Sequence, residues 1–108
     1  MIIIFRIFVP IKPYRITVKR TLFMNKIHII GNIGNDISNF RKEVKELEKD
    51  WEISYNFQYM CLNNDRVQLT ITSKNSYEFK AYLLNDADTI SDYLEQKTKF
   101  DTENIQIS

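Results

Sequence analysis

Aromatic side chains are concentrated in the segments that the sequence predicts to be strands, and they are the residues best suited to binding a ligand. These side chains are Trp51, Tyr55, Phe57, Tyr59, Tyr77, Phe79 and Tyr82. Aromatic rings carried by a sheet can stack on the bases of single-stranded nucleic acid when basic side chains lie beside them. Rings in half-buried strands also fill protein cores. The residues alone therefore leave base stacking and core packing open.

Residues that catalyse reactions or bind metals are scarce in this chain. His28 is the only histidine and lies within an apolar run, and Cys61 is the only cysteine, so neither a metal-binding cluster nor an internal disulfide can be assembled. The segment GNIGND lacks the lysine and hydroxyl residue of a P-loop and the third glycine of a dinucleotide-binding loop. We therefore expect a non-enzymatic protein with no catalytic residues, no metal and no cofactor.

Residues 24–36, MNKIHIIGNIGND, are predicted to form a central strand that ends in a turn. The isoleucines favour an extended backbone because β-branched side chains pack well on a pleated surface. Gly31 and Gly34 are the only glycines in the chain, and they allow the backbone to bend or close at this point. We expect the rest of the domain to be organised around this strand.

Helices and strands alternate in the remainder of the chain. Hydrophobic periodicity predicts a helix at 37–49, a strand at 51–62, a turn at 63–65, a strand at 66–72, a helix at 86–97 and a short strand at 104–108. Residues 77–84 fit either a strand or the start of a helix. We expect Asn35 or Asp36 to cap the first helix and Asp86 to cap the second. The charges on residues 37–49 are mixed in sign, which indicates a solvated face.

Charge is distributed unevenly along the 108 residues. Residues 1–35 contain six basic and no acidic residues, whereas the rest contains nine basic and fourteen acidic residues, a net charge of −5. The length predicts one domain, at residues 24–108. Residues 1–23 are expected to be a basic extension, which is an extra hairpin, a presequence or sequence upstream of a start at Met24. Their apolar run is too short to span a bilayer, so no membrane association is expected.

A family resemblance begins in the predicted central strand. There the chain reads Asn25-Lys26-Ile27-His28-Ile29-Ile30-Gly31-Asn32-Ile33-Gly34-Asn35-Asp36. Shorter segments follow in a matching order, namely Asn56-Phe57, Glu78-Phe79, Ala87-Asp88 and Tyr93-Leu94. These segments resemble bacterial-type single-stranded DNA-binding proteins, whose first strand reads approximately Asn-Lys-Val-x-Leu-Ile/Val-Gly-Asn/Arg-Leu-Gly-x-Asp-Pro. The resemblance touches about 85 residues and is most specific in its first dozen.

The resemblance implies an OB-fold barrel in which the helix predicted at 86–97 closes one end. With both predicted helices, the expected fold is mainly β with two helices (β+α). It implies a protein of DNA replication that coats single-stranded DNA through base stacking and phosphate contacts and assembles as a homo-oligomer. The contact residues expected on this basis are Lys26, Phe57, Phe79, Lys80 and Tyr82. The implied location is the cytoplasm of a bacterial or phage-type system, or an organelle matrix if residues 1–23 are a presequence.

Without the resemblance, the predicted order of the elements indicates a different fold. Strand, helix, two strands, helix and strand fit a ferredoxin-like βαββαβ sandwich of the α+β class. Such a sandwich would act as a protein-binding module of the inhibitor or immunity type, with a protein as its partner. Residues 77–84 distinguish the two folds, because a strand there favours the barrel.

Overall fold

The computed structural model describes residues 15–18, 25–63, 65–74 and 80–108. The elements, in chain order, are β1 (Arg15–Val18), β2 (Lys26–Asn32), α2 (Ile37–Asp50), β3 (Tyr55–Asn63), β4 (Arg66–Ser73), α3 (Lys80–Lys97) and β5 (Asp101–Ile107). The first strand of the predicted N-terminal hairpin lies outside the described residues. Arg15–Val18, which falls in its second strand, pairs in parallel with β5.

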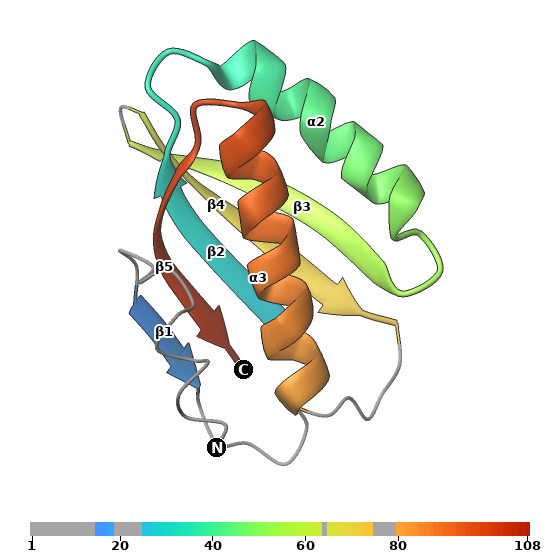
Figure 1. Ribbon diagram of the computed structural model, residues 1–108. Coiled ribbons are helices and arrows are strands. Elements are labelled where there is room, and N and C mark those ends of the chain that lie inside the picture. The colour runs from blue at the N-terminus through green and yellow to red at the C-terminus, as the bar shows by residue number, and fades with distance from the viewer. Residues whose placement is uncertain (1–14, 19–24, 64, 75–79) are drawn as a thin grey trace.

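The strands form one open sheet in the order β1-β5-β2-β4-β3 (Figure 1). Within it, β5, β2, β4 and β3 make a four-stranded antiparallel sheet, because β2 is antiparallel to both β5 and β4, and β4 is antiparallel to β3. The strand built on residues 24–36 therefore lies in the middle of the sheet, as its apolar sequence predicted.

Both helices cover the same face of the sheet (Figure 1). Alternate residues of the strands point toward them, and the burial of β4 alternates strictly between half-buried and buried from Arg66 to Ser73. The core between the two layers holds eighteen buried apolar side chains of the described residues, from Ile27 and Ile29 on β2 to Ile105 and Ile107 on β5. Burial of this apolar surface is the main favourable contribution to the stability of the fold.

The turn after β2 joins the sheet to α2. Gly34 has a φ of 57°, in the left-handed region, and its N–H donates to Asn32 Oδ1 at 2.8 Å. Asp36 occupies the N-cap position of α2, but its side chain makes no capping hydrogen bond. Instead Asp36 Oδ2 accepts a hydrogen bond from the backbone N–H of Lys99 at 3.0 Å. The carboxylate expected to cap α2 therefore binds the loop between α3 and β5.

Helix α3 is longer than the sequence predicted. It begins at Lys80, so the described part of the ambiguous segment 77–84 is helical, and the expectation that Asp86 caps the helix is wrong. Asp86 lies inside the helix and accepts a hydrogen bond from the hydroxyl of Tyr55 on β3. The helix therefore starts before Asp86, the residue that the sequence predicts as its cap, and packs against the sheet there. No helix of the described residues is both long and apolar enough to cross a membrane.

The strand boundaries also differ from the predicted ones. Residues 51–54 form a turn, so β3 begins at Tyr55 instead of Trp51. β5 begins at Asp101, three residues before the predicted terminal strand. It starts there because it pairs with β2 as far as Asn32, through a register shift beside Gly31. The extra residues of β5 are extended because they pair with β2, and their own hydrophobic pattern does not predict a strand.

Candidate functional site

The residues predicted to contact DNA do not gather on one described surface. Lys26 is exposed at the start of β2, on the face of the sheet away from the helices. Phe57 is only 6% exposed and belongs to the core. Tyr82 is 61% exposed but lies on α3, in the other layer. Phe79 lies outside the described residues and Lys80 begins α3, so Lys80 and Tyr82 are not on a strand.

The face of the sheet away from the helices is polar around His28, with Met60 and Leu62 exposed toward the β3 edge. At its centre, His28 Nδ1 lies 3.4 Å from Gln68 Nε2 and 3.4 Å from Thr70 Oγ1, and His28 Nε2 lies 3.4 Å from Ser108 Oγ. Among the described strand residues on this face there is no phenylalanine, tyrosine or tryptophan. Nor do His, Cys, Asp and Glu of the described segments gather into a group that could hold a metal. This face therefore offers hydrogen bonds but no ring for a base to stack on.

The outer edge of β3 is the unusual feature of this structure. In the described part of the chain β3 pairs with β4 alone, and it is the last strand of the sheet. Its nine residues, YNFQYMCLN, include no charged residue, no proline and no glycine. Met60 is 54% exposed, Leu62 is 39% exposed, and Cys61 between them is exposed as well. Edge strands are normally protected from pairing by lysine, proline or a short length, and β3 has none of these.

The hydrogen-bond alternation determines which groups β3 presents at this edge. The Lys74 N–H donates to the Ser54 carbonyl at 2.9 Å, and the Ser73 N–H donates to the Asn25 carbonyl at 2.7 Å. Residues 54, 56, 58 and 60 are therefore the ones that bond to β4, because bonding alternates along an antiparallel pair. The N–H groups of Phe57, Tyr59 and Cys61 consequently point away from β4, toward the outer edge, whereas the Tyr55 N–H donates to the Trp51 carbonyl at 2.9 Å.

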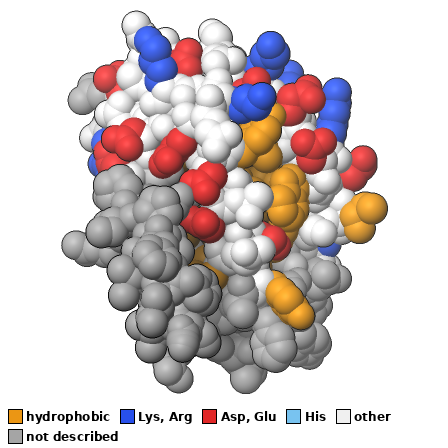
Figure 2. Space-filling view, viewed as in Figure 1, with side chains coloured by type: hydrophobic (Ala, Val, Ile, Leu, Met, Phe, Trp, Pro, Cys, Tyr) orange, Lys and Arg blue, Asp and Glu red, His pale blue; other side chains and the backbone are white. Residues whose placement is uncertain are grey.

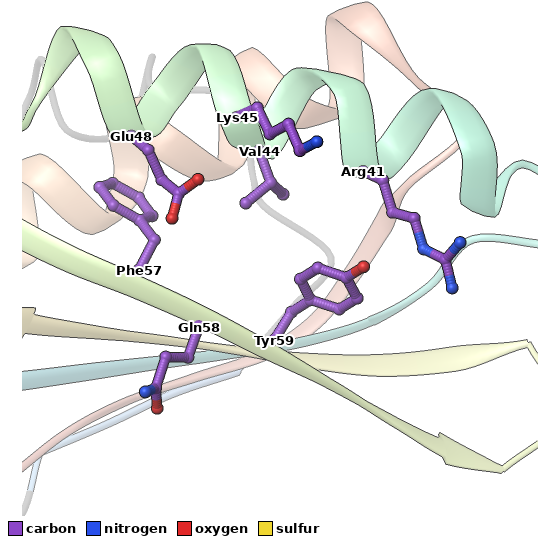
Figure 3. A pocket seen from close by; sticks show the side chains of 7 residues that line it. All are labelled: Arg41, Val44, Lys45, Glu48, Phe57, Gln58 and Tyr59. Atoms are coloured by element: carbon purple, nitrogen blue, oxygen red, sulfur yellow. The ribbon is translucent and has the colours of Figure 1, made fainter.

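A groove of about 630 Å³ lies between this edge and α2. Its lining consists of Arg41, Val44, Lys45, Glu48, Phe57, Gln58 and Tyr59 (Figure 3). The ring of Tyr59 packs edge-on against Phe40 with 5.7 Å between the ring centroids, which holds it as one wall of the groove. Phe57 and Tyr59 thus direct their side chains into the helix-covered face and their amide groups to the open edge.

The two ends of the groove carry opposite charges. In Figure 3 the Glu48 carboxylate lies near Phe57, whereas the Lys45 amine and the Arg41 guanidinium lie toward Tyr59. Arg41 and Lys45 are exposed and stand one turn apart on α2. The ion pairs of the described residues, Lys49 with Glu46 and Arg66 with Glu103, involve neither of them.

The sequence alone does not reveal this site. The mixed charges of residues 37–49 predict a solvated face, because the sequence does not show which side of the helix borders the end of the sheet. The spacing of Arg41 and Lys45 was the signal on the helix, since residues four apart share a face. The uncharged run YNFQYMCLN was the signal on the strand.

The two helices are themselves joined and differ in charge. The Tyr93 hydroxyl on α3 donates to Glu43 Oε1 on α2 at 2.6 Å, and this hydrogen bond to a carboxylate raises the pKa of Tyr93 to about 12. Figure 2 shows a strip of hydrophobic side chains between the helices, with acidic side chains toward α3 and side chains of both signs toward α2. The surface near α3 is therefore the more acidic of the two.

Comparisons of this chain with protein-family models, with curated proteins and with solved structures found no match.

Proposed function

We propose that this protein is a ferredoxin-like βαββαβ sandwich that acts as a protein-binding module through the outer edge of β3. The strand order β5-β2-β4-β3 supports the fold, because the first and third strands of the unit lie in the centre and the second and fourth outside. The helix over residues 80–97 supports it as well, since the barrel interpretation needs a strand around Phe79 to Tyr82. In this proposal β1 is an addition outside the unit.

The observation that carries the function is the unprotected edge of β3. An edge strand of nine residues without a charge or a proline invites another strand to pair with it. A partner segment that adds to the edge gains main-chain hydrogen bonds, while pockets beside the edge select its alternate side chains. The outward amide groups of Phe57 and Tyr59 and the groove under α2 provide both parts of that mode of recognition.

The geometry favours a protein over single-stranded DNA as the partner. Base stacking needs exposed rings on a surface with basic side chains. Phe57 is buried, and the described polar face carries no aromatic ring. Residues from Asp36 onward have a net charge of −5, which opposes a phosphate backbone.

Proline at Cys61 tests the proposal, because it removes an N–H that points to the outer edge and leaves the ladder with β4 intact. Peptides that bind the whole chain would first be selected from a displayed library of random short sequences. Their affinity would then be measured for the wild type, for Cys61→Pro and for the control Cys61→Ala. We expect Cys61→Pro to weaken binding about ten-fold or more and Cys61→Ala to leave it nearly unchanged.

The location of binding and the competing partner are tested in the same preparation. Nuclear magnetic resonance should show the largest amide shifts in residues 55–63 when a selected peptide is added. Shifts elsewhere, or equal affinity for Cys61→Pro, would contradict the proposal. So would tight binding of oligo-dT at moderate salt together with failure to select any peptide, because a nucleic-acid partner then explains the protein better.

A further inference from the structure

We infer that the segment recognised by the edge of β3 is acidic, with an aspartate or glutamate at the position that pairs with Tyr59. This inference rests on the proposed function, since it specifies the partner of the same site. Residues that face each other across an antiparallel pair share one side of the sheet. A partner residue opposite Tyr59 therefore points its side chain into the groove between β3 and α2.

The cations of the groove determine which side chain fits there. Arg41 and Lys45 direct their charged groups toward the Tyr59 end (Figure 3), and β3 itself supplies no acidic residue to neutralise them. A carboxylate at this point would meet a guanidinium and an ammonium group at the rim of a partly enclosed groove, where such pairs are stronger than on an open surface. Glu48 at the Phe57 end disfavours a second acid two residues along the partner.

The partner residue that faces Met60 should be apolar. Gln58 and Met60 alternate with Tyr59, so the partner residues next to the acidic one face the other side of the sheet. On that side Met60 is 54% exposed, and Leu62 beyond it is 39% exposed. An apolar side chain on the partner would cover Met60, whereas the residue on the other side of the acid faces the polar Gln58. The expected motif is an acidic residue with an apolar residue on its Met60 side, in an extended segment.

A second copy of this chain is the competing occupant of the same edge. If two β3 strands paired about a two-fold axis, the Glu48 end of one groove would face the Arg41 and Lys45 end of the other. A second β3 contains no acidic residue, however, so it cannot place a carboxylate directly opposite Tyr59. The other helix of the layer, α3, is acidic and would repel an acidic partner. This repulsion directs such a partner toward α2.

Charge reversal within α2 separates contact with the groove from the general field of the helix. The test variant is Arg41→Glu with Lys45→Glu, and its matched control is Lys42→Glu with Lys49→Glu. Both pairs are exposed cations of α2 and change the net charge equally, but Lys42 and Lys49 do not line the groove. The probes are the selected peptides, with their acidic residue replaced by glutamine or by lysine in two analogues.

We expect the selected peptides to share an acidic residue with an apolar residue next to it, on the side that faces Met60. The Arg41→Glu and Lys45→Glu variant should bind them at least ten-fold more weakly, the control within about three-fold, and the lysine analogue should recover affinity for the reversed variant. Binding should also weaken as salt is raised.

Each other outcome overturns a defined part of the argument. Peptides that need the Cys61 N–H but carry no acid, or ignore the reversal at Arg41 and Lys45, would overturn the acidic partner and leave the proposed function in place. Failure of peptide binding altogether would overturn both. A dimer of the chain that pairs through β3, or oligo-dT binding lost only in the reversed variant, would assign the edge to another partner and refute the inference.

Discussion

Replacing Gly31 by alanine should destabilise this protein severely, for a reason that has nothing to do with backbone conformation. Gly31 lies on β2 where the register with β5 shifts, and a Cβ there would be 2.5 Å from the Asp101 carbonyl oxygen and 2.5 Å from Cζ of Phe100. Phe100 is 3% exposed and stacks on Phe40 with 5.5 Å between centroids, so its ring cannot swing aside without opening the core. We expect the free energy of unfolding to fall by about 3 kcal/mol, the upper end of the range for overpacking.

Urea unfolding measures this loss, with the fluorescence of Trp51 as the signal. The control is Gly34→Ala, whose Cβ would have nothing within 4 Å but whose φ of 57° suits glycine. Its cost should be about 1 kcal/mol, from the left-handed backbone alone. Equal losses for the two variants, or no loss for Gly31→Ala, would refute the view that close approach of β5 explains Gly31.

Three further substitutions test the contacts that define the layers and the edge. Tyr93→Phe should cost about 1 kcal/mol at neutral pH, since the hydrogen bond to Glu43 is partly screened by solvent. Because the folded pKa of Tyr93 is about 12 and an unfolded tyrosine has a pKa of about 10, this contribution is complete below pH 10 and is lost as the pH rises through 12, so the two proteins should converge in stability over that window. Thr102→Val should raise the melting temperature slightly, because the buried Thr102 hydroxyl has no hydrogen-bond partner in the described structure. Proline at Met60 should unfold more readily than proline at Cys61 by about 1 kcal/mol or more, because only Met60 bonds to β4 by the alternation of the ladder.

Much of the element order could be predicted from the sequence. The helix predicted at 37–49 and the strand predicted at 66–72 each agree with the structure to within one residue. These elements have strong periodicity along one continuous segment, so burial of one face and their local preference agree. The isoleucines at positions 27, 29 and 30 likewise predict the place of β2 in the interior of the sheet.

The parts that could not be predicted depend on residues far apart in the chain. The start of α3 at Lys80 and the early start of β5 at Asp101 follow from packing on the sheet and pairing with β2, neither of which leaves a local signal. The role of Asp36 is similar, because its acceptor is used by Lys99, which lies 63 residues away. Local sequence rules predict that Asp36 caps the helix, but in the folded protein its carboxylate binds Lys99 instead.

The candidate site follows the same division. That residues 55–63 form a strand without a charge, and that Arg41 and Lys45 share a helix face, are properties of the sequence alone. That this strand is the last in the sheet, and that those cations border its outer edge, are decided by the order β5-β2-β4-β3 and by the helix layer. Strand order depends on which distant segments pair, and alternation along one strand carries no information about its neighbours. The chain therefore specifies its elements locally, whereas the edge on which the proposed function depends exists only in the folded sheet.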